Sequence, residues 1–186
     1  MPTKVINRTL PATAVRPSLR RGNPAALVAV HTGQTVLDLG SRAGIAVLMY
    51  ARRVGPTGKA YGLDMSYEML ALARQNQWLA GVENAAFLQG RIEAIPLRDN
   101  SVDVIVSNGV IKLSATQNRV LAEVFRVLKP GGRFAVSGVA EAMREPGCRG
   151  QLAAAGFEQI AIEPESPYRV GIRAVKPVGR AIGAAS

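Results

Sequence analysis

Two kinds of hydrophobic pattern alternate along the chain from residue 35 to residue 175. Short, nearly continuous apolar runs predict strands at residues 35–39, 60–64, 85–89, 102–107, 133–137, 160–163 and 170–175. Apolar residues at helical spacing between these runs predict helices at residues 43–53, 66–80, 117–128 and 151–155. Strands that are apolar on both faces and alternate with helices are typical of a parallel sheet covered on both sides. The pattern therefore predicts an α/β fold with a doubly wound, mostly parallel sheet and a final strand pair.

Turn and capping residues agree with these boundaries. Ser66 is a good N-cap for the helix at residues 66–80, because its hydroxyl can accept a bond from a free backbone N–H. Residues 55–58 (Gly-Pro-Thr-Gly) predict a turn. Residues 129–132 (Lys-Pro-Gly-Gly) are expected to end the preceding helix.

The loop after the first strand is the first candidate binding site. Sheets of this kind bind ligands beyond the carboxyl ends of their strands, which directs attention to residues 38–44, 64–66, 90–93 and 107–113. The glycines Gly40 and Gly44 let backbone N–H groups approach a ligand at the start of a helix. Asp64 ends the second strand, where a carboxylate can accept both ribose hydroxyls. This combination predicts a nucleoside-containing ligand.

Two residues of the same loop argue against NAD. Asp38 lies two residues before the first glycine, and Arg42 stands where a dinucleotide pattern has a glycine that admits the pyrophosphate. A carboxylate at this entrance would repel phosphates but suits an ammonium or sulfonium centre. S-adenosylmethionine carries both of these cations.

Composition and charge indicate one globular domain with basic ends. The chain has 186 residues, of which 48% are hydrophobic and 19% charged. Residues 1–22 carry basic residues and no acidic ones, and much of the net charge of +10 lies there and in the last residues. We expect a basic arm at residues 1–22, a globular domain at residues 23–177 and a tail at residues 178–186. This distribution favours a small-molecule partner over a nucleic-acid groove, although the basic ends could bind nucleic acid in a salt-sensitive way.

Cysteine and histidine are too scarce for a disulfide framework or a cysteine-rich metal site. Cys148 is the only cysteine and His31 the only histidine. We expect Cys148 in a loop or the core, His31 on the surface, and no bound metal. The scarcity of cysteine favours a reduced, cytoplasmic setting. No apolar run reaches the length of a membrane helix, so we expect no membrane partner.

Four ordered motifs carry a resemblance to a known family. They are VLDLGSRAG, YGLDMSYEMLALAR, FLQGRIEAIPLRDNSVDVIVSNGVIKLS and VFRVLKPGGRFAVS. With GNPAAL before them and GIRAVKP after them, they resemble class I S-adenosylmethionine-dependent methyltransferases, and more narrowly the arsenite methyltransferase-like branch. The resemblance implies a Rossmann-like sheet with an antiparallel C-terminal pair and S-adenosylmethionine as cofactor. It also implies methyl transfer to a small-molecule or metalloid (arsenite-like) acceptor.

The resemblance also implies where the cofactor binds. Asp64 would hold the ribose, with Met65 against the adenine. The loop after the first strand would bind the methionine part through Asp38, Gly40, Ser41 and Gly44. The other side of the adenine would meet Arg91, Ile92 and Glu93. Asn108 and Gly109 would lie beside the transferable methyl group, and no catalytic base is implied.

Three departures from the family pattern bear on activity. Arg42 replaces a glycine, and at a positive φ a non-glycine residue costs about 1–2 kcal/mol. Its guanidinium would either fill the space of the methionine tail or pair with the cofactor's carboxylate. Gly109 replaces the family's cysteine, so a polydentate thiolate site for arsenic is missing. The segment 137–152 is shorter than in the family, which leaves a smaller cover over the substrate.

These departures leave two other functions open. One is a catalytically impaired relative that acts as a cofactor sensor or a partner-binding module. The other is nucleic-acid binding through the basic arms, with RNA as the methyl acceptor. The pattern does not determine the oligomeric state.

Overall fold

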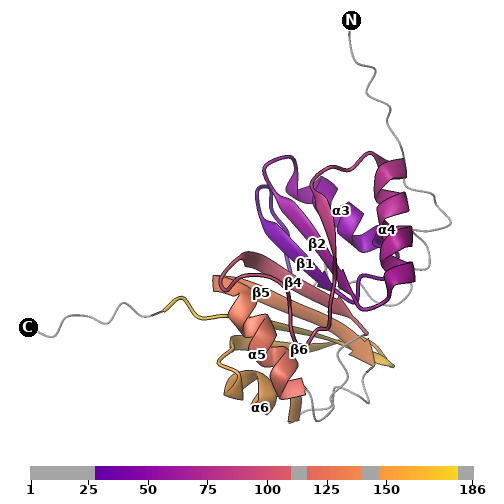
Figure 1. Ribbon diagram of the computed structural model, residues 1–186. Coiled ribbons are helices and arrows are strands. Elements are labelled where there is room, and N and C mark those ends of the chain that lie inside the picture. Colours follow the sequence, from indigo (N-terminus) through magenta and orange to yellow (C-terminus); the bar gives the residue numbers. More distant parts are fainter. Residues whose placement is uncertain (1–27, 110–116, 140–146, 180–186) are drawn as a thin grey trace, which may run out of the picture.

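The computed structural model describes residues 28–109, 117–139 and 147–179 (Figure 1). The proposed arm at residues 1–22 and all but the first two residues of the proposed tail lie outside these ranges. The strands are β1 (Thr35–Leu39), β2 (Lys59–Asp64), β3 (Ala85–Gln89), β4 (Val102–Asn108), β5 (Leu128–Val139), β6 (Glu158–Ser166) and β7 (Arg169–Val175). The helices are α3 (Ile45–Val54), α4 (Tyr67–Ala80), α5 (Gln117–Val127) and α6 (Gly147–Ala154).

All these strands form one sheet in the order β3-β2-β1-β4-β5-β7-β6. The strands from β3 to β5 are parallel, and β7 pairs antiparallel with both β5 and β6. The strand order reverses at β1, which lies between β2 and β4, so the sheet is doubly wound. The predicted mostly parallel sheet with an antiparallel C-terminal pair is confirmed.

The sheet separates two hydrophobic layers, because successive side chains of a strand point to opposite faces. Leu37 and Leu39 pack in the layer that includes residues of α5 and α6. Val36 packs in the other layer, with residues of α3 and α4. Figure 1 shows the same division, with α3 and α4 near β1 and β2, and α5 and α6 near β5 and β6. The apolar runs of the sequence are thus buried on both faces.

The strand register brings distant parts of the chain together on one side of the sheet, at the carboxyl ends of the parallel strands. Leu39 of β1 lies beside Leu63 of β2 and Ser107 of β4. Asn108 at the end of β4 lies beside Ser137 of β5. The antiparallel β7 starts at this same edge, since Arg169 pairs with Val139 of β5. The ends of β1, β2 and β4 and the start of β7 therefore lie on the same side of the sheet.

The segment after α5 differs from the expectation. The helix ends at Val127 and residues 128–132 belong to β5, although Lys-Pro-Gly-Gly was expected to separate the helix from the strand. The register between β4 and β5 shifts here, which takes up the extra residues. Gly131 donates its N–H to the Lys176 carbonyl at 2.9 Å, and the Gly132 carbonyl accepts from the Lys176 N–H at 2.9 Å. Pairing with the chain beyond β7 therefore holds this irregular segment in the sheet, with Gly131 at a φ of 76°.

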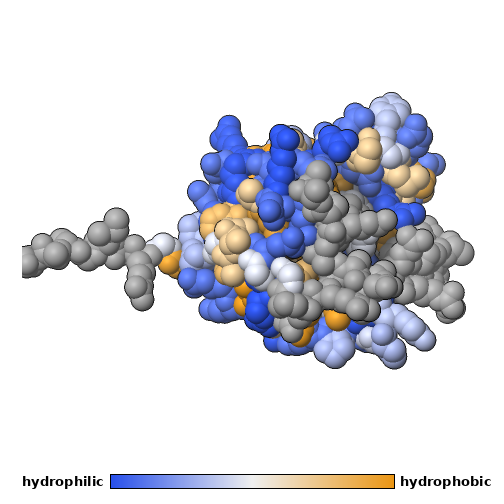
Figure 2. Space-filling view, turned by 90° about the horizontal axis from the view of Figure 1, so that it is seen from below, coloured by the Kyte–Doolittle hydropathy of each residue, from blue (hydrophilic) through white to orange (hydrophobic). Residues whose placement is uncertain are grey.

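The face in Figure 2 is mostly hydrophilic over the described residues, and its hydrophobic residues form smaller areas between them. Among the described helices, none is long and apolar enough to cross a membrane. His31 is exposed before β1, as expected.

Candidate functional site

A cavity of about 360 Å³ lies at the edge of the sheet where the parallel strands end. Its volume is within the range of about 300–1,000 Å³ that is usual for small-molecule sites. It is lined by Gly40, Arg42, Leu63, Asp64, Met65, Gly90, Arg91, Ile92, Glu93, Asn108, Gly109 and Arg169. Most of the predicted cofactor-binding residues therefore come together here. Asp38, Ser41 and Gly44 do not line the cavity.

The loop after β1 forms one wall and is held by backbone bonds to β2. The N–H groups of Gly40 and Ser41 both donate to the carbonyl of Leu63, at 2.8 and 3.0 Å. Gly40 and Gly44 have φ values of 75°, a left-handed conformation that favours glycine. The loop is thus fixed over the end of β2 before α3 begins.

Asp64 is oriented by two backbone donors. Its Oδ2 accepts the N–H of Arg42 at 2.8 Å, and its Oδ1 accepts the N–H of Ser66 at 2.9 Å. A carboxylate oxygen has more than one lone-pair site, so each oxygen keeps capacity for a further donor. The side chain is therefore prepared to accept the two hydroxyls of a ribose.

Arg42 has the strained backbone that the sequence analysis considered. Its φ is 51°, in the left-handed region, and the residue is exposed on the cavity wall. The cost of that conformation is about 1–2 kcal/mol for a residue other than glycine. The cavity remains open with the Arg42 side chain in place, which argues against obstruction of the ligand.

Asp38 lies beneath the loop and is only 6% exposed. Its pKa is raised to about 7, chiefly because burial disfavours the charged form and also because Asp64 repels it. The neighbouring Tyr50 has its pKa raised by burial and by the charge of Asp38. The carboxylate at this position is therefore poorly compensated, which suits a cation above it.

Ser41 and Gly44 support the loop from inside the fold. The Ser41 Oγ is buried and has no hydrogen-bond partner among the described residues. A Cβ on Gly62 would come within 2.7 Å of that Oγ, so Ser41 packs against β2. A Cβ on Gly44 would come within 2.5 Å of the Phe87 ring. These contacts position the loop, and a direct role in binding the cofactor stays a prediction for both residues.

The opposite wall comes from the ends of β2 and β3. Met65 is 69% exposed, and Ile92 is partly buried between Arg91 and Glu93. The Arg91 Nε lies 3.5 Å from Glu93 Oε2, which braces this segment. The wall presents the apolar surface that a flat adenine ring would contact, with charged groups beside it.

Leu63 and Gly90 also line the cavity; Gly90 falls in the range 90–93 that the sequence indicated but had no predicted role, and Leu63 was not predicted. The Gly90 N–H donates to the Asp64 carbonyl at 3.1 Å. A Cβ on Gly90 would meet Leu63 at 3.1 Å, so a larger residue would crowd this wall. The position of Gly90 directly after the third predicted strand was a usable signal.

At the other end of the cavity Asn108 and Gly109 meet Arg169 from the start of β7. The Arg169 Nη2 donates to Asn108 Oδ1 at 3.0 Å and to Ser137 Oγ at 2.8 Å. Arg169 was missed because its place depends on the antiparallel pairing of β7 with β5. A signal existed in the sequence: the first residue of an antiparallel strand lies at the carboxyl edge of its parallel neighbours.

Other polar residues that the sequence raised have structural positions. Cys148 is buried in α6 beside the core residue Leu152 and away from the cavity lining, as expected for a small core residue. Asp103 accepts the Thr35 N–H at 2.8 Å and pairs with Lys129 at 2.9 Å, which ties β4 to its neighbours. Within the described ranges, no group of three or more His, Cys, Asp or Glu side chains could hold a metal ion. The shortened segment 137–152 falls partly outside the described residues.

The chemistry of the cavity fits S-adenosylmethionine. The oriented carboxylate of Asp64 suits a ribose, and the wall with Met65 and Ile92 suits an adenine. The buried Asp38 carboxylate below the loop suits the cationic methionine end. Asn108 and Gly109 also line the cavity, and their place beside the methyl group stays a prediction.

Comparisons with known proteins agree with this geometry. A family model described as a methyltransferase domain matches residues 30–165. The arsenite methyltransferase of Halobacterium salinarum is 39% identical over an alignment of 165 positions, and the match covers 77% of this chain and 42% of that protein. The ubiquinone/menaquinone biosynthesis C-methyltransferase of Salmonella arizonae is 36% identical over 118 residues, which make up 63% of this chain and 47% of that protein.

A solved structure supports the same fold. The S-adenosylmethionine-dependent methyltransferase of Aquifex aeolicus has a TM-score of 0.74 and 24% identity, over 88% of this chain and 97% of that one. The chain spans less than half the length of both curated relatives. The predicted resemblance to class I methyltransferases and to their arsenite methyltransferase-like branch is confirmed, with S-adenosylmethionine as cofactor. Since the family model covers most of the sequence, the chain belongs to the methyltransferase domain family.

Proposed function

We propose that this protein transfers a methyl group from S-adenosylmethionine to a small-molecule or metalloid acceptor. The observation that carries the proposal is the cavity in which Asp64, Met65, Asn108 and Gly109 meet at the carboxyl edge of the sheet. S-adenosylmethionine supplies a methyl group on a positively charged sulfur, which an electron-rich atom can take without acid catalysis. The protein's part is then to align the two molecules and exclude water, which can lower the barrier by several kcal/mol.

In this proposal each wall of the cavity binds one part of the cofactor. Asp64 holds the ribose, and Met65 and Ile92 enclose the adenine. The methionine end lies along the loop that starts at Gly40, above the buried Asp38. Arg42, exposed on the same wall, is suitably placed to pair with the methionine carboxylate. The catalytic domain in this proposal comprises residues 23–177.

The acceptor class rests on the relatives and on the cysteine count. The similarity to an arsenite methyltransferase supports a metalloid acceptor, and the similarity to a quinone C-methyltransferase supports an organic one. A single buried cysteine cannot chelate arsenic through several thiolates, because such a site needs more than one soft ligand. A metalloid acceptor would therefore have to arrive with its own thiolate ligands.

A second candidate function follows from the departures at the site. Gly109 stands where the family has a cysteine, and Arg42 introduces backbone strain beside the cofactor. A chain with these features would bind S-adenosylmethionine without turnover and act as a sensor or partner-binding module. The cytoplasmic location and the weak binding of nucleic acid by the basic ends stay predictions.

Calorimetric titration tests the proposal directly. S-adenosylmethionine should bind with a micromolar dissociation constant at pH 8, where Asp38 is ionised. An Asp64→Asn variant, which keeps the shape and loses the charge, should bind at least about tenfold more weakly because its charge-assisted hydrogen bonds are lost. The matched control is Asp103→Asn, a carboxylate on the opposite edge that should leave the affinity unchanged. Absence of heat at millimolar ligand would contradict the proposal.

Methyl transfer is followed separately, with radiolabelled S-adenosylmethionine and arsenite in the presence and absence of glutathione. Product that forms only with glutathione supports an acceptor that brings its own thiolates. Tight cofactor binding without any labelled product, over a panel of thiols and phenols as well, favours the sensor function.

A further inference from the structure

A cluster of four polar residues lies at the end of the cavity formed by Asn108, Gly109 and Arg169, away from the wall that contains Met65 and Ile92. It consists of Asn108 from β4, Ser137 from β5, and Glu165 and Arg169 from the β6–β7 hairpin. We call this cluster the acceptor wall. The Ser137 hydroxyl donates to Glu165, and Arg169 Nη2 donates to the Ser137 and Asn108 oxygens. The cluster therefore connects four strands at the place where an acceptor would approach the methyl group.

Of the two charged residues in this cluster, only the cation faces the cavity. Arg169 is among the lining residues, whereas Glu165 is not. The carboxylates that do line the cavity, Asp64 and Glu93, follow β2 and β3, and β1, β4 and β5 separate β2 from β7. Among the described residues, the acceptor end is thus positively charged where it meets a ligand.

The Arg169 guanidinium also keeps unused hydrogen-bonding capacity. Its hydrogen bonds to described residues both leave from Nη2, so Nη1 donates to none of them, and its buried Nε has no hydrogen-bond acceptor there either. The Nε lies 3.6 Å from Glu165 Oε2, which is an ion pair without a hydrogen bond. Because the side chain is 22% exposed, its charge is only partly screened by water. A guanidinium in this state can still bind an anion.

We propose that Arg169 selects the methyl acceptor by binding an anionic oxygen or sulfur on it, so that the protein prefers acceptors that arrive as anions. This inference rests on the proposed function and specifies its substrate class. A protonated amine would meet a like charge at this wall. The acceptor end also offers no uncommitted carboxylate among the described residues that could remove a proton.

An anionic acceptor is attracted to Arg169 and needs no base, because it carries no proton that has to be removed. Its lone pair forms the bond to the methyl carbon, the carbon–sulfur bond of the donor breaks, and that electron pair stays on the sulfur. The anion and the sulfonium cation both become neutral, and no proton has to move. The wall then needs to recognise the acceptor's charge and needs no general base.

The test compares two probes that share a shape and differ in charge. The probes are 4-nitrobenzenethiolate and its uncharged methyl thioether, each titrated into the protein saturated with S-adenosylhomocysteine. The wild-type protein should bind the thiolate about tenfold more tightly than the thioether, as expected for one charge-assisted hydrogen bond. Loss of the thiolate's yellow colour on methylation, with S-adenosylmethionine in place of the product, gives an independent readout.

Three variants separate recognition from folding. Arg169→Met should abolish the preference for the thiolate while the affinity for S-adenosylhomocysteine changes by less than about twofold, because the two ligands bind to different walls. Arg169→Lys should restore part of the preference. Glu165→Gln removes the counter-charge and should increase the preference about two- to threefold, which a purely structural role of the pair would not do.

The outcomes distinguish this inference from the proposed function. Failure of the wild-type protein to bind S-adenosylhomocysteine would overturn the proposed function and this inference together. Normal binding of S-adenosylhomocysteine with equal affinity for both probes, or an unchanged preference in Arg169→Met, would overturn this inference alone.

Discussion

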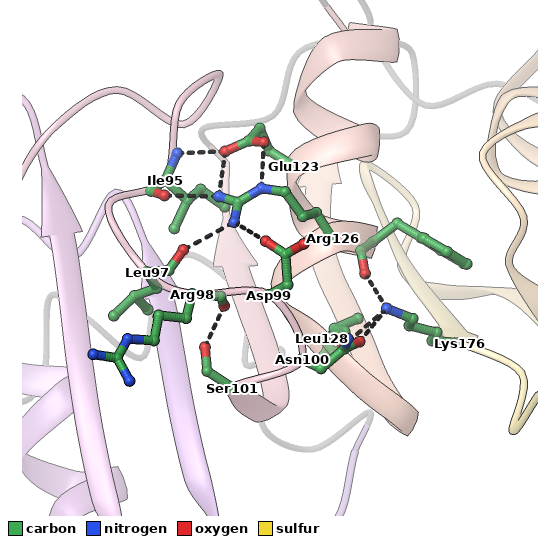
Figure 3. A network of polar contacts seen from close by, with 11 residues as sticks. Ile95, Leu97, Arg98, Asp99, Asn100, Ser101, Glu123, Arg126, Leu128 and Lys176 are labelled. Carbon is green, nitrogen blue, oxygen red and sulfur yellow. Dashed lines mark hydrogen bonds and ion pairs between the residues drawn. The ribbon is translucent and has the colours of Figure 1, made fainter.

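Arg126 lies near the amino end of β4 and Arg169 near the carboxyl ends of the parallel strands, and the two arginines have very different surroundings. Arg126 in α5 uses every N–H of its guanidinium: it binds both oxygens of Glu123, one oxygen of Asp99, and the carbonyls of Ile95 and Leu97, at 2.6–2.9 Å (Figure 3). Arg169 makes its hydrogen bonds from one nitrogen only, and its Nε has no hydrogen-bond acceptor among the described residues. Arg126, whose N–H groups all have hydrogen-bond partners, connects parts of the fold. Arg169, whose Nε has no acceptor among the described residues, lies at the cavity.

The same difference extends to the neighbours of each arginine. Next to Arg126, the Lys176 ammonium donates to Asn100 and to the carbonyls of Phe125 and Leu128, each at 2.8 Å (Figure 3). At the cavity edge, by contrast, Asp38 is buried with a raised pKa, the Ser41 hydroxyl has no partner in the described part of the chain, and Arg42 has a positive φ. Among the described residues, two of the three buried side-chain atoms without a hydrogen-bond partner, Ser41 Oγ and Arg169 Nε, therefore lie at or beside the cavity.

The largest effect is expected from Arg126→Met. This change removes several hydrogen bonds to charged partners and leaves the Glu123 carboxylate without its cation, so the unfolding free energy should fall by about 3 kcal/mol. Arg169→Met should cost less, about 1 kcal/mol, because its side chain makes only two hydrogen bonds to described residues and both accepting groups are uncharged. Urea denaturation followed by circular dichroism measures both values. An equal fall in the unfolding free energy of both variants would contradict the proposed difference between Arg126 and Arg169.

A second test addresses the support of the loop at the cavity. In Gly44→Ala, a Cβ would come within 2.5 Å of the Phe87 ring at a φ of 75°. Strain and overpacking together should lower the unfolding free energy by about 3 kcal/mol. Gly81→Ala is the matched control, because it has a φ of 61° with no atom within 4 Å of the new Cβ. The control should lose only about 1 kcal/mol, and a similar loss in both variants would contradict the importance of the Phe87 contact.

The third prediction concerns pH. The pKa of Asp38 is about 7 in the folded protein and near 3.8 when the residue is exposed, so between these values the folded state holds a proton that the unfolded state has released. Stability from this group therefore falls as the pH rises toward 7 and is constant above it. Relative to wild type, Asp38→Asn should gain about 2 kcal/mol between pH 5 and pH 7. Parallel stability curves for the two proteins would show that Asp38 does not titrate in this range.

The smallest effect is expected from Arg42→Gly. Glycine adopts the φ of 51° without strain but has more conformational freedom in the unfolded chain, so the net gain should be about 0.5–1 kcal/mol. The affinity for S-adenosylmethionine should fall by about threefold if Arg42 pairs with the methionine carboxylate, a partly exposed contact. Thermal unfolding and calorimetric titration measure the two effects. A gain in affinity would instead indicate that the arginine obstructs the site.

Much of the fold was accessible from local patterns. The strands at residues 35–39 and 85–89 were predicted with the observed bounds, because their apolar runs are short and sharply delimited. The Ser66 cap is confirmed: its hydroxyl accepts the Met69 N–H at 3.2 Å at the start of α4. The boundary between α5 and β5 was displaced, because the pairing of Gly131 and Gly132 with Lys176 is a long-range contact.

The sequence alone also predicted most of the residues that line the cavity wall proposed for the cofactor. Asp38 and Gly40 lie at the end of the first predicted strand and Asp64 at the end of the second, so the strand–loop–helix pattern places all three at the carboxyl ends of the strands. Only the tertiary structure decided that Asp38 lies beneath the loop, and that Arg169 reaches Asn108 across 61 positions of the chain. Local periodicity reports which residues a strand buries, whereas the pairing of β5 with β7 determines which distant side chains share an edge.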